Sequence, residues 1–439
     1  MPVADAYHIS FMEYGGAKIK GGCNKRTEKL IMGLKEITDK INIDEYNYDL
    51  PEERIAQYPL KERDMSQLLV FTGGRISKDI FRNIANYIPS DSLLVFNNTK
   101  VIRARLLFTK ETGAAIEIFC LEPLNPGSYE LSLTAKGQAE WKCLIGNLKK
   151  WKRRTISKTF CCNGKEYELT AEKIKEEGDA WRIRFKWIPG ELTFGEVIGS
   201  FGHIPLPPYV KRNDEELDYI RYQTIYSSIE GSVASPTAGL HFTNNVINSI
   251  LGKGIKMKEI TLHTGAGTFQ PVRGSDITKH KMHCEHYIIS RKLIEELLQT
   301  EDRIIACGTT SVRTLESIFW LGNKLLNNQF LNTSDLHTDQ WEPYLSETRA
   351  PVKDSLTALL DYLDQRKISF MNATTRIMIL PGYEFRITNG IITNFHMPKS
   401  TLLLLISAWT GQDWKKIYRF ALCNNFRFLS YGDSSLLMK

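Results

Sequence analysis

Between residues 103 and 190 the helical pattern disappears from the sequence, and short stretches of alternating apolar and polar residues replace it. Alternation with a period of two is typical of strands that expose one face to solvent. Asn163-Gly164 is a strong signal for a two-residue hairpin turn between two such stretches. Short strands joined by turns predict a small antiparallel barrel or sandwich here. The expected strands are Ala114–Leu121, Tyr129–Thr134, Trp141–Ile145, Thr155–Phe160, Glu166–Thr170 and Trp181–Trp187.

On both sides of this region the pattern is mixed, and from about residue 193 strands and helices alternate. Such alternation is typical of an α/β layer with a partly parallel sheet. The expected fold is therefore an α/β domain (44–104 plus 191–439) interrupted by an inserted antiparallel β-barrel domain (105–190). The expected strands are Ser66–Phe71, Ser92–Phe96, Lys256–Leu262 and Arg303–Cys307, and the expected helices are Asp79–Ile88, Phe242–Leu251, one starting at Ser311, and Ser355–Gln365.

Two stretches depart from these patterns. Residues 1–43 are polar and basic, are interrupted by glycines and lack periodicity, which predicts a poorly ordered extension. Residues 322–375 read as a polar insertion within the α/β domain that holds one of the expected helices.

The basic excess of the chain is concentrated in the β-rich region. Lys and Arg total 57 and Asp and Glu total 50, a formal net charge of +7. Between Lys136 and Lys158 there are eight basic residues and one acidic residue, Glu140, so this stretch alone carries +7. Trp141 and Trp151 are interleaved with these charges. The pattern fits a polyanion partner, although on charge alone a solvated, lysine-rich sheet face is the simpler interpretation.

Cysteine usage and hydropathy exclude several protein classes. The eight cysteines stand at 23, 120, 143, 161, 162, 284, 307 and 423 without a Cys-x-x-Cys pair, so neither a disulfide framework nor a thiolate zinc site is expected. The longest apolar run, near Thr401–Trp409, is too short to span a bilayer, and no signal peptide is evident. These features predict a cytoplasmic protein that does not enter a membrane.

A histidine cluster raises the question of a metal site. His280, His283 and His286 are spaced by three, which on a helix could present two ligands on one face. Lys279 and Lys281 flank the cluster and would oppose a cation, and no His-Glu-x-x-His motif is present. No metal is therefore expected.

Four segments join small residues and hydroxyls to a His or an Arg: 235–242, 262–269, 308–317 and 394–401. Three of them are expected at strand ends or helix starts, where free backbone N–H groups bind anions such as carboxylate or phosphate. In the third segment, the hydroxyls of residues 309–311 are the expected cap of the following helix. One such segment would be explained as a cap and a turn, but four in one α/β domain favour a composite ligand pocket.

These segments resemble the S-adenosylmethionine:tRNA ribosyltransferase-isomerase family of queuosine biosynthesis. The resemblance runs from about Tyr48 to Leu437, and so many stretches in the same order make it highly specific. The other matching stretches are 49–59, 94–102, 202–209, 280–283, 381–383 and 430–433.

The resemblance implies both a fold and a reaction. The family fold is an α/β domain with an inserted β-barrel domain, which agrees with the pattern above. S-adenosylmethionine serves as a ribosyl donor to 7-aminomethyl-7-deazaguanine at the tRNA wobble position. The product is epoxyqueuosine-tRNA, with release of adenine and methionine, and no cofactor is implied beyond S-adenosylmethionine as co-substrate.

This chemistry needs a base near the acidified ribose C5′ hydrogen and a proton donor or hydrogen bond for the departing adenine. An imidazole suits either task, and His241, His263 and His396 lie in matching motifs, with His241 or His263 the expected base. Arg313 and the helix start before it are the expected site of the methionine carboxylate. The expected substrate-binding residues are Pro236, Thr237, Ala238, Gly239, Phe242, Gly265, Gly267, Thr309, Thr310, Ser311, Arg313 and Asp433.

On the RNA side, Lys and Arg side chains are expected to contact phosphates. Aromatic rings are expected to stack on a splayed-out base. The candidate rings are Phe242, Phe269 and Tyr431, for which core packing is an equal explanation. Asp433 could take a ribose hydroxyl or stabilise a turn. The expected tRNA-binding residues are Asn97, Asn98, Lys100, Arg103 and Arg105 near the predicted domain junction, and Lys149, Lys150, Arg153 and Arg154 on the inserted domain.

The sequence departs from the family pattern at three places. His286 stands where an aromatic residue is common, Cys284 replaces a usual Ser, and the insertion at 322–375 exceeds the shorter members and could alter tRNA selection. A related S-adenosylmethionine-using enzyme with a different acceptor, and a non-catalytic tRNA-binding protein, are therefore the alternatives. The expected partners are S-adenosylmethionine and tRNA carrying the deazaguanine precursor, and the expected state is a monomer.

Overall fold

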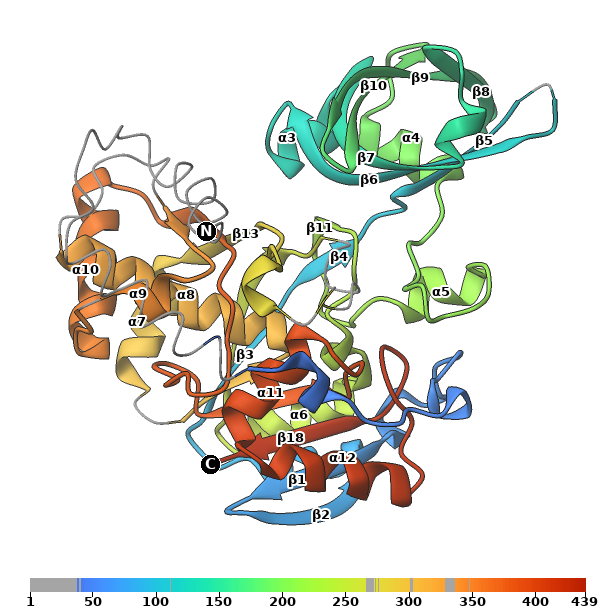
Figure 1. Ribbon diagram of the computed structural model, residues 1–439. Helices are drawn as coiled ribbons and strands as arrows, with labels where there is room; N and C mark the ends of the chain where they lie inside the picture. Colours follow the sequence, from blue (N-terminus) through green and yellow to red (C-terminus); the bar gives the residue numbers. More distant parts are fainter. Residues whose placement is uncertain are drawn as a thin grey trace, which may run out of the picture.

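The chain folds around two sheets, one with ten strands and one with six (Figure 1). In this computed structural model, the structure is described for residue 38 and for residues 41–110, 112–265, 272, 274, 276–300, 303–327, 336–346 and 348–439. A short parallel pair, β4 (Thr99–Val101) with β11 (Ile229–Ser232), lies between the two sheets (Figure 1).

The ten-stranded sheet has the order β15-β16-β13-β12-β3-β14-β17-β18-β1-β2. Its strands β12, β3, β14 and β17 run parallel to one another. Their carboxyl ends therefore meet at one edge, which is where open α/β sheets bind ligands. The strands are β1 (Gln67–Thr72), β2 (Arg75–Ile80), β3 (Leu93–Asn97), β12 (Lys256–His263), β13 (Glu285–Ser290), β14 (Ile304–Cys307), β15 (His337–Thr338), β16 (Phe370–Thr375), β17 (Gly390–Asn394) and β18 (Ser434–Met438).

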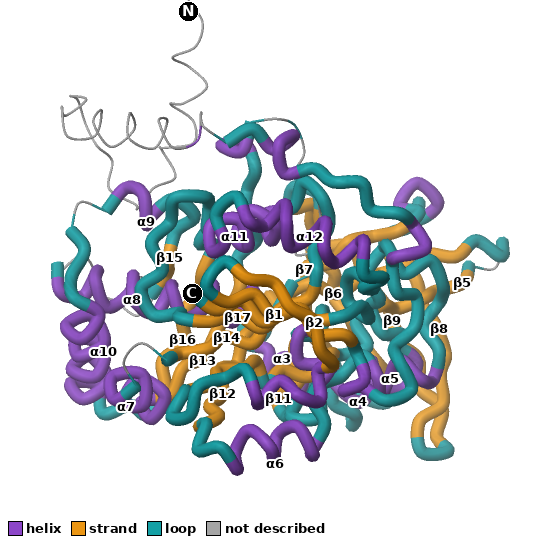
Figure 2. Tube along the Cα trace, turned by 90° about the horizontal axis from the view of Figure 1, so that it is seen from below, coloured by secondary structure: helices purple, strands orange, loops and turns teal. Residues whose placement is uncertain are grey.

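Both faces of this sheet are covered. On β3, Leu93 and Val95 belong to one apolar core and Leu94 and Phe96 to the other. A strand buried on both faces needs a continuous apolar run, and the sequence supplies one here. Helices α11 and α12 lie on one side of the strands and α6 on the other (Figure 2). The longer helices are α6 (Asn244–Gly252), α7 (Arg291–Gln299), α8 (Thr309–Leu326), α10 (Val352–Arg366), α11 (Thr401–Thr410) and α12 (Asp413–Cys423).

The six-stranded sheet has the order β5-β6-β7-β10-β9-β8 and is antiparallel throughout. It curls into a nearly closed barrel, in which Lys158 Nζ on β8 donates to the Leu107 carbonyl on β5 at 2.9 Å. Helix α4 (Phe194–Phe201) packs inside the curl, with Phe194 against Trp141 and Phe185 (Figure 1). The strands are β5 (Arg105–Thr109), β6 (Ala115–Asn125), β7 (Gln138–Gly146), β8 (Thr155–Cys162), β9 (Lys165–Glu177) and β10 (Ala180–Ile188).

The expected mixed α/β fold with an antiparallel, barrel-like sheet is confirmed at this level, whereas the division into two domains stays a prediction. The hairpin turn between β8 and β9 is also confirmed. Asn163 and Gly164 have φ values of 50° and 76°, the left-handed pair that a type I′ turn requires.

Two predicted elements were wrong. Tyr129–Thr134 is not a strand but the short helix α3, because Ser128 accepts a hydrogen bond from Leu131 N and caps it. Its buried residues Tyr129, Ser132 and Leu133 follow helical spacing, which overrides the apparent alternation. The expected helix Asp79–Ile88 is the end of β2 followed by the 3₁₀ helix η4 (Phe81–Asn86). The Gly73-Gly74 turn, with φ values of 55° and 76°, folds β2 back on β1 as a hairpin.

The two stretches that departed from the pattern are partly integrated into the fold. Residues 1–37, 39 and 40 of the expected extension lie outside the described residues, but Ile41 and Ile43 are buried in the main core. In the expected insertion, β15, the short helix α9 (Glu342–Leu345), α10 and β16 are present, and β15 and β16 extend the large sheet. Among the helices that the structure describes, none has the length and hydropathy needed to cross a bilayer.

Candidate functional site

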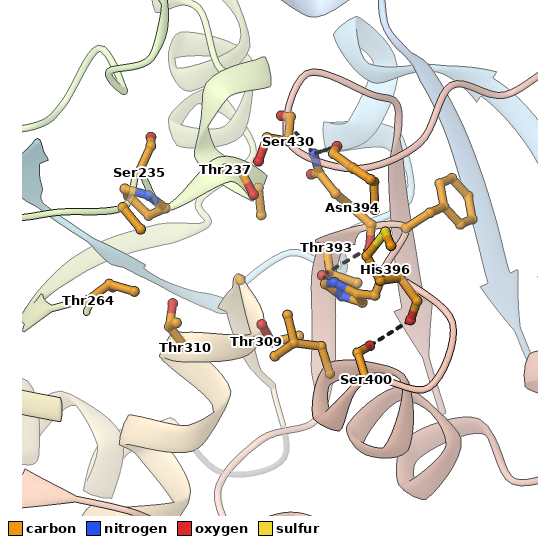
Figure 3. Close-up of a pocket in the computed structure, with 18 of the residues that line it drawn as sticks. Ser235, Thr237, Thr264, Thr309, Thr310, Thr393, Asn394, His396, Ser400 and Ser430 are labelled. Atoms are coloured by element: carbon orange, nitrogen blue, oxygen red, sulfur yellow. Dashed lines mark hydrogen bonds between the residues drawn. The ribbon is translucent and has the colours of Figure 1, made fainter. Parts of the chain in front are cut away.

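A cavity with about 770 Å³ of open space lies at the carboxyl-terminal edge of the parallel strands. We call it the main cavity. Segments that follow β12, β14 and β17 contribute to its wall, together with the 3₁₀ helix η6 (Thr237–His241). The structure thus brings together parts of all four segments singled out in the sequence. Its polar lining residues include Ser235, Thr237, Thr264, Thr309, Thr310, Thr393, Asn394, His396, Ser400 and Ser430 (Figure 3).

The amino terminus of α8 opens into the main cavity. Gly308, Thr309 and Thr310 line the wall, and α8 begins at Thr309 without any side-chain cap. The expected capping role of residues 309–311 was therefore wrong. Ser311 Oγ instead donates to the Cys307 carbonyl at 2.7 Å, within the helix. The uncapped first turn leaves backbone N–H groups and the positive end of an 18-residue helix facing the cavity, an arrangement that suits a carboxylate.

His396 is the histidine that lines the main cavity. Its Nε2 lies 2.9 Å from Thr393 Oγ1, and the Thr393 hydroxyl donates to the Asn394 carbonyl at 3.3 Å (Figure 3). Because a hydroxyl has one proton, this pattern favours the tautomer with the proton on His396 Nε2 and an accepting Nδ1. Burial lowers the pKa of His396 to about 3, so the ring is neutral at pH 7.

His241 is held on both ring nitrogens and faces away from the main cavity. Nδ1 lies 2.8 Å from Ser66 Oγ, and Nε2 lies 3.1 Å from Asn394 Oδ1. Burial lowers the pKa of His241 to about 4, with smaller contributions from Arg427 and Arg63. The ring therefore holds Asn394, a wall residue of the main cavity, in place.

His263 ends β12 and is stacked on Tyr129 of α3, with ring centroids 4.1 Å apart. It is buried, and its Nδ1 has no hydrogen-bond partner among the described residues. Burial and, to a smaller extent, His286 together lower the pKa of His263 to about 4. The stack joins the helix beside the barrel to the edge of the large sheet, while the next residue, Thr264, lines the main cavity.

Arg313 is not among the residues that line the main cavity. It is 3% exposed and forms an ion pair with Glu285, and its Nε donates to the Ile377 carbonyl at 3.1 Å. Burial raises the pKa of Glu285, and Arg313 opposes that rise. The guanidinium therefore already has a buried carboxylate partner from β13.

The remaining expected substrate residues divide between wall and core. Pro236, Thr237 and Ala238 line the main cavity, whereas Phe242 is fully buried in the core below η6. Gly239 packs so closely against Tyr226 that a Cβ atom would lie 1.9 Å from its hydroxyl oxygen. The further positions Gly267 and Phe269 lie outside the described residues, and Gly265 is described but is not part of the wall.

The carboxylate of Asp433 is buried and bonded to backbone groups of the protein. It is 1% exposed and accepts hydrogen bonds from Gln67 N at 3.0 Å and Arg427 N at 2.7 Å. Burial raises the pKa of Asp433, and these hydrogen bonds and Arg427 oppose the rise. Tyr431, a candidate stacking ring, is 4% exposed and donates to Asp218 Oδ1 at 2.6 Å.

The expected RNA contacts near the strand end are mostly occupied within the protein. Asn97 bonds to both backbone groups of Leu262, and Asn98 donates to Glu259 Oε2 at 2.7 Å. The three cations there also have partners: Lys100 pairs with Glu230 at 3.0 Å, Arg103 Nη1 donates to the Gly199 carbonyl at 2.7 Å, and Arg105 Nε pairs with Glu117 at 2.8 Å.

The basic stretch between β7 and β8 is more open. Lys149, Lys150 and Arg153 are exposed and have no ion-pair partner in the described part of the chain, whereas Arg154 pairs with Glu172 at 2.8 Å. Trp151 is buried and packs under Lys173, with its backbone carbonyl accepting from Lys173 Nζ at 2.7 Å. This stretch therefore presents unpaired positive charge to solvent.

Several wall residues were not among the expected substrate-binding residues, notably Tyr209, Thr393, Ser400 and Ser430. Tyr209 and Ser430 lie in stretches already matched to the family (202–209 and 430–433), and their hydroxyl oxygens are 2.6 Å apart. The signal was present, but nothing in the sequence said that two stretches so far apart meet. Within the described residues, no group of three or more His, Cys, Asp or Glu side chains is arranged to hold a metal ion.

Comparisons with known proteins agree with the earlier resemblance. The family model described as "Queuosine biosynthesis protein" matches residues 43–437. A protein named S-adenosylmethionine:tRNA ribosyltransferase-isomerase from Trichlorobacter lovleyi is 36% identical over 408 residues, covering 90% of this chain and 99% of the relative. A protein of the same name from Thermotoga petrophila is 36% identical over 404 residues, covering 91% of this chain and all of the relative.

A crystal structure of S-adenosylmethionine tRNA ribosyltransferase from Thermotoga maritima is 27% identical and covers 90% of this chain and all of that chain, with a TM-score of 0.42. The family model and the relatives each span about nine-tenths of the sequence. The chain therefore belongs to the queuosine biosynthesis protein family.

Proposed function

We propose that this protein is an S-adenosylmethionine:tRNA ribosyltransferase-isomerase. It transfers and isomerises the ribosyl moiety of S-adenosylmethionine onto 7-aminomethyl-7-deazaguanine at the tRNA wobble position, giving epoxyqueuosine-tRNA, adenine and methionine. The observation that carries the proposal is the near-complete match to relatives of that name. A substrate of this kind is consistent with action in the cytoplasm.

The main cavity is the proposed donor site. Its position at the carboxyl ends of the parallel strands is the usual ligand site of such sheets. The uncapped start of α8 supplies backbone donors and a positive dipole end, which suits the methionine carboxylate of the donor. This assignment gives the carboxylate to Thr309 and Thr310 rather than to Arg313, which is already paired with Glu285.

His396 is the proposed base for the ribose C5′ hydrogen. It lines the cavity, is neutral at pH 7 and has an accepting Nδ1 in the favoured tautomer. His241, an expected base, has both ring nitrogens engaged, so its proposed role is to position Asn394. His263 stays a second candidate because its Nδ1 is unpaired among the described residues and it adjoins Thr264 in the wall.

The basic stretch between β7 and β8 is the proposed first contact for the tRNA backbone. Lys149, Lys150 and Arg153 are exposed and have no acidic partner among the residues that the structure describes, so their charges are available to phosphates. The barrel would then hold the RNA while the edge of the large sheet carries out the chemistry.

One assay tests the activity. The protein is incubated with S-adenosylmethionine and tRNA carrying the deazaguanine precursor, and adenine and methionine are measured. Release of adenine and methionine that depends on that tRNA supports the proposal. Release only with another acceptor contradicts the proposed acceptor substrate. Tight, salt-sensitive tRNA binding with no release would indicate a non-catalytic binding protein. The same assay in the presence of a chelator checks the expectation that no metal is needed.

A further inference from the structure

A second, smaller cavity adjoins the main cavity, with about 270 Å³ of empty space when the solvent at its mouth is included. We call it the arginine cavity, because Arg63, Arg221 and Arg427 line it. The two cavities share Ser430 as a wall residue. They also meet through His241, which lines the arginine cavity and bonds to Asn394 in the wall of the main cavity. Figure 3 shows Asn394 and Ser430 side by side on the main-cavity side of this partition.

The arginine cavity has three guanidinium groups and no acidic residue in its lining. Within the described part of the chain, Arg63 donates only to backbone carbonyls, those of Gln223 at 2.8 Å, Leu240 at 3.2 Å and Ile220 at 3.0 Å. Arg221 likewise donates to the carbonyls of Lys61 and Leu60. Such bonds fix the two guanidiniums in place without neutralising their charge.

Arg427 shares its partner carboxylate, the buried Asp433, with backbone N–H groups. Its Nη2 lies 3.5 Å from Asp433 Oδ1, and both Asp433 oxygens already accept backbone N–H groups. Its Nη1 donates to the Tyr58 carbonyl at 3.3 Å, a long hydrogen bond. Three positive groups therefore converge beside one carboxylate, which is shared with two backbone N–H groups.

Burial also removes water from two of these guanidinium groups, those of Arg63 and Arg221. The Nε atom of Arg221 is buried and has no hydrogen-bond partner among the described residues. Burial and, to a smaller extent, the neighbouring Arg221 together lower the pKa of Arg63 to about 10. Ser66 and His241 complete the wall as neutral groups bonded to each other at 2.8 Å. Guanidinium groups that outnumber the nearby carboxylates and are held at fixed positions are the usual means by which proteins bind phosphate or carboxylate oxygens.

We propose that the arginine cavity is an oxyanion site and that it takes a phosphodiester of the tRNA backbone close to the modified nucleotide. This inference rests on the proposed function for the identity of the RNA. The donor carboxylate is the other source of an oxyanion, but the partition of His241, Asn394 and Ser430 separates the two cavities. The donor also has the uncapped start of α8 within its own cavity.

The site explains how the acceptor nucleotide is aimed. A phosphate held by the three arginines fixes the RNA backbone one residue layer from the donor cavity. The attached nucleotide can then be turned into the main cavity past Ser430. The basic stretch between β7 and β8 would attract the RNA, whereas the arginine cavity would set its position.

The test compares two substitutions of Arg427, which has the longest hydrogen bond to a backbone carbonyl of the three arginines. Both Arg427→Gln and Arg427→Lys remove the guanidinium that bonds to Tyr58, but only the lysine variant keeps a positive charge beside Asp433. We expect Arg427→Gln to weaken tRNA binding about tenfold at low salt and to reduce the salt slope by about 0.7–0.9, the value for one phosphate contact. Arg427→Lys should retain most of the slope, and S-adenosylmethionine affinity should stay at the wild-type value in both variants.

Arg291→Gln is the matched control, because Arg291 lies on α7 and pairs with Glu295 and Asp364, far from this cavity in sequence and fold. It removes the same charge and should leave the salt slope unchanged. Melting temperatures of all variants check that the fold persists. A second readout uses inorganic phosphate, which should raise the melting temperature of the wild type more than chloride at equal ionic strength, but not that of Arg427→Gln.

The outcomes separate this inference from the proposed function. An Arg427→Gln protein that is folded and keeps the wild-type salt slope for tRNA would overturn the inference, even if adenine release persists. If Arg427→Gln lost affinity for S-adenosylmethionine but kept the wild-type salt slope of tRNA binding, the cavity would bind the donor carboxylate. That result would overturn the inference that the cavity binds a phosphodiester. A wild-type protein that releases no adenine with tRNA would contradict the proposed function instead, while the phosphate-dependent melting shift would still report on the anion site.

Discussion

Three histidines lie in stretches that match the family but differ in what surrounds each ring. His241 is saturated by Ser66 and Asn394, His263 stacks on Tyr129, and His396 faces the main cavity. An imidazole acts as a base only where a nitrogen lone pair reaches the substrate. His396 meets that condition most directly.

Replacing His396 with Asn should therefore lower turnover by about 10²- to 10⁴-fold, the usual contribution of a general base. The affinity for tRNA should change little, because the ring does not lie on the basic stretch. Adenine release under saturating tRNA measures the first quantity and a binding titration the second. Thr393→Val is the companion variant, since it removes the tautomer-fixing hydroxyl but keeps the ring. Near-normal turnover of His396→Asn would return the role of base to His263.

The same burial makes stability depend on pH. His241 and His263 have pKa values lowered to about 4, whereas an unfolded histidine titrates near 6.5. As the pH falls from about 6.5 toward 4, the unfolded chain binds protons that the folded chain does not. The free energy of unfolding should fall by up to about 1.4 kcal/mol per pH unit for each ring. Denaturant unfolding at pH 7, 6 and 5 measures this slope.

His241→Gln should remove one ring's share of that slope. Ser66→Ala is its control, because it breaks the hydrogen bond to His241 but leaves the titrating ring. A slope that is the same in wild type and His241→Gln would show that His241 does not titrate differently in the folded and unfolded chains.

Arg313 and Glu285 form a buried pair whose separation should be costly. Glu285→Gln leaves a guanidinium that is 3% exposed without its carboxylate, so the free energy of unfolding should fall by about 3–5 kcal/mol. The double variant Arg313→Met with Glu285→Leu should recover much of that loss, because no charge is left unpaired. Chemical denaturation measures both. If the folded fraction of Arg313→Met lost S-adenosylmethionine affinity, Arg313 would instead contact the donor.

Helix α8 is an element in which nearly every residue is buried, from Thr309 to Asn323. Its small hydroxyl residues make this possible, because Ser311, Thr314 and Ser317 each bond to the carbonyl four residues earlier. The helix thus runs through the core without unsatisfied hydroxyls and delivers its uncapped amino terminus to the main cavity.

A negative charge at that terminus should compete with the donor carboxylate. Thr310→Asp places a carboxylate in the first turn of α8, where it stabilises the helix by about 0.3–1 kcal/mol, so loss of folding is not expected. The affinity for S-adenosylmethionine should fall at least tenfold, roughly 1.4 kcal/mol. Thr310→Asn is the neutral control of the same shape and should bind nearly as well as wild type. Calorimetric titration measures both, and equal affinities would exclude the helix start as the carboxylate site.

At the scale of the whole molecule, the barrel and the large sheet have separate proposed tasks. They are joined at the Tyr129–His263 stack, next to the wall of the main cavity. The unpaired charge lies on the barrel, between β7 and β8. Binding of the RNA and binding of the donor should therefore be separable by mutation.

Neutralising Lys149, Lys150, Arg153 and Arg154 should flatten the salt dependence of tRNA binding and spare S-adenosylmethionine binding. Each charge that contacts a phosphate contributes about 0.7–0.9 to the slope, and Arg154 should contribute least because Glu172 already pairs with it. Filter binding between 50 and 200 mM salt, roughly the range over which such contacts weaken, measures the slope. Lys256 and Lys258 on β12 of the large sheet, both paired with Glu296 on α7, provide the control substitutions. An unchanged slope would assign the basic stretch to a solvated sheet face.

The sequence alone was sufficient for the family and for a mixed α/β fold with an antiparallel, barrel-like sheet. Period-two alternation over residues 105–190, the doubly buried run Leu93–Phe96 and the Asn163-Gly164 turn each reflect local physics that survives in the folded chain. The sequence pattern predicted the wrong element where both the strand period and the helical period fit the same short stretch. Tyr129–Thr134 was read as a strand, and the Ser128 cap decided for a helix.

The site could be predicted only as a set of segments. Composition identified the four segments that meet at the main cavity, but not which side chains face it, because that depends on packing against residues far away in the chain. His396 rather than His241 faces the main cavity. Arg313, on helix α8, pairs with Glu285 on β13. Arg63, Arg221 and Arg427 come from three distant parts of the sequence and meet only in the folded chain. Periodicity and turn chemistry are local and so determined the elements, whereas burial and charge pairing arise between distant residues and were decided by the tertiary structure alone.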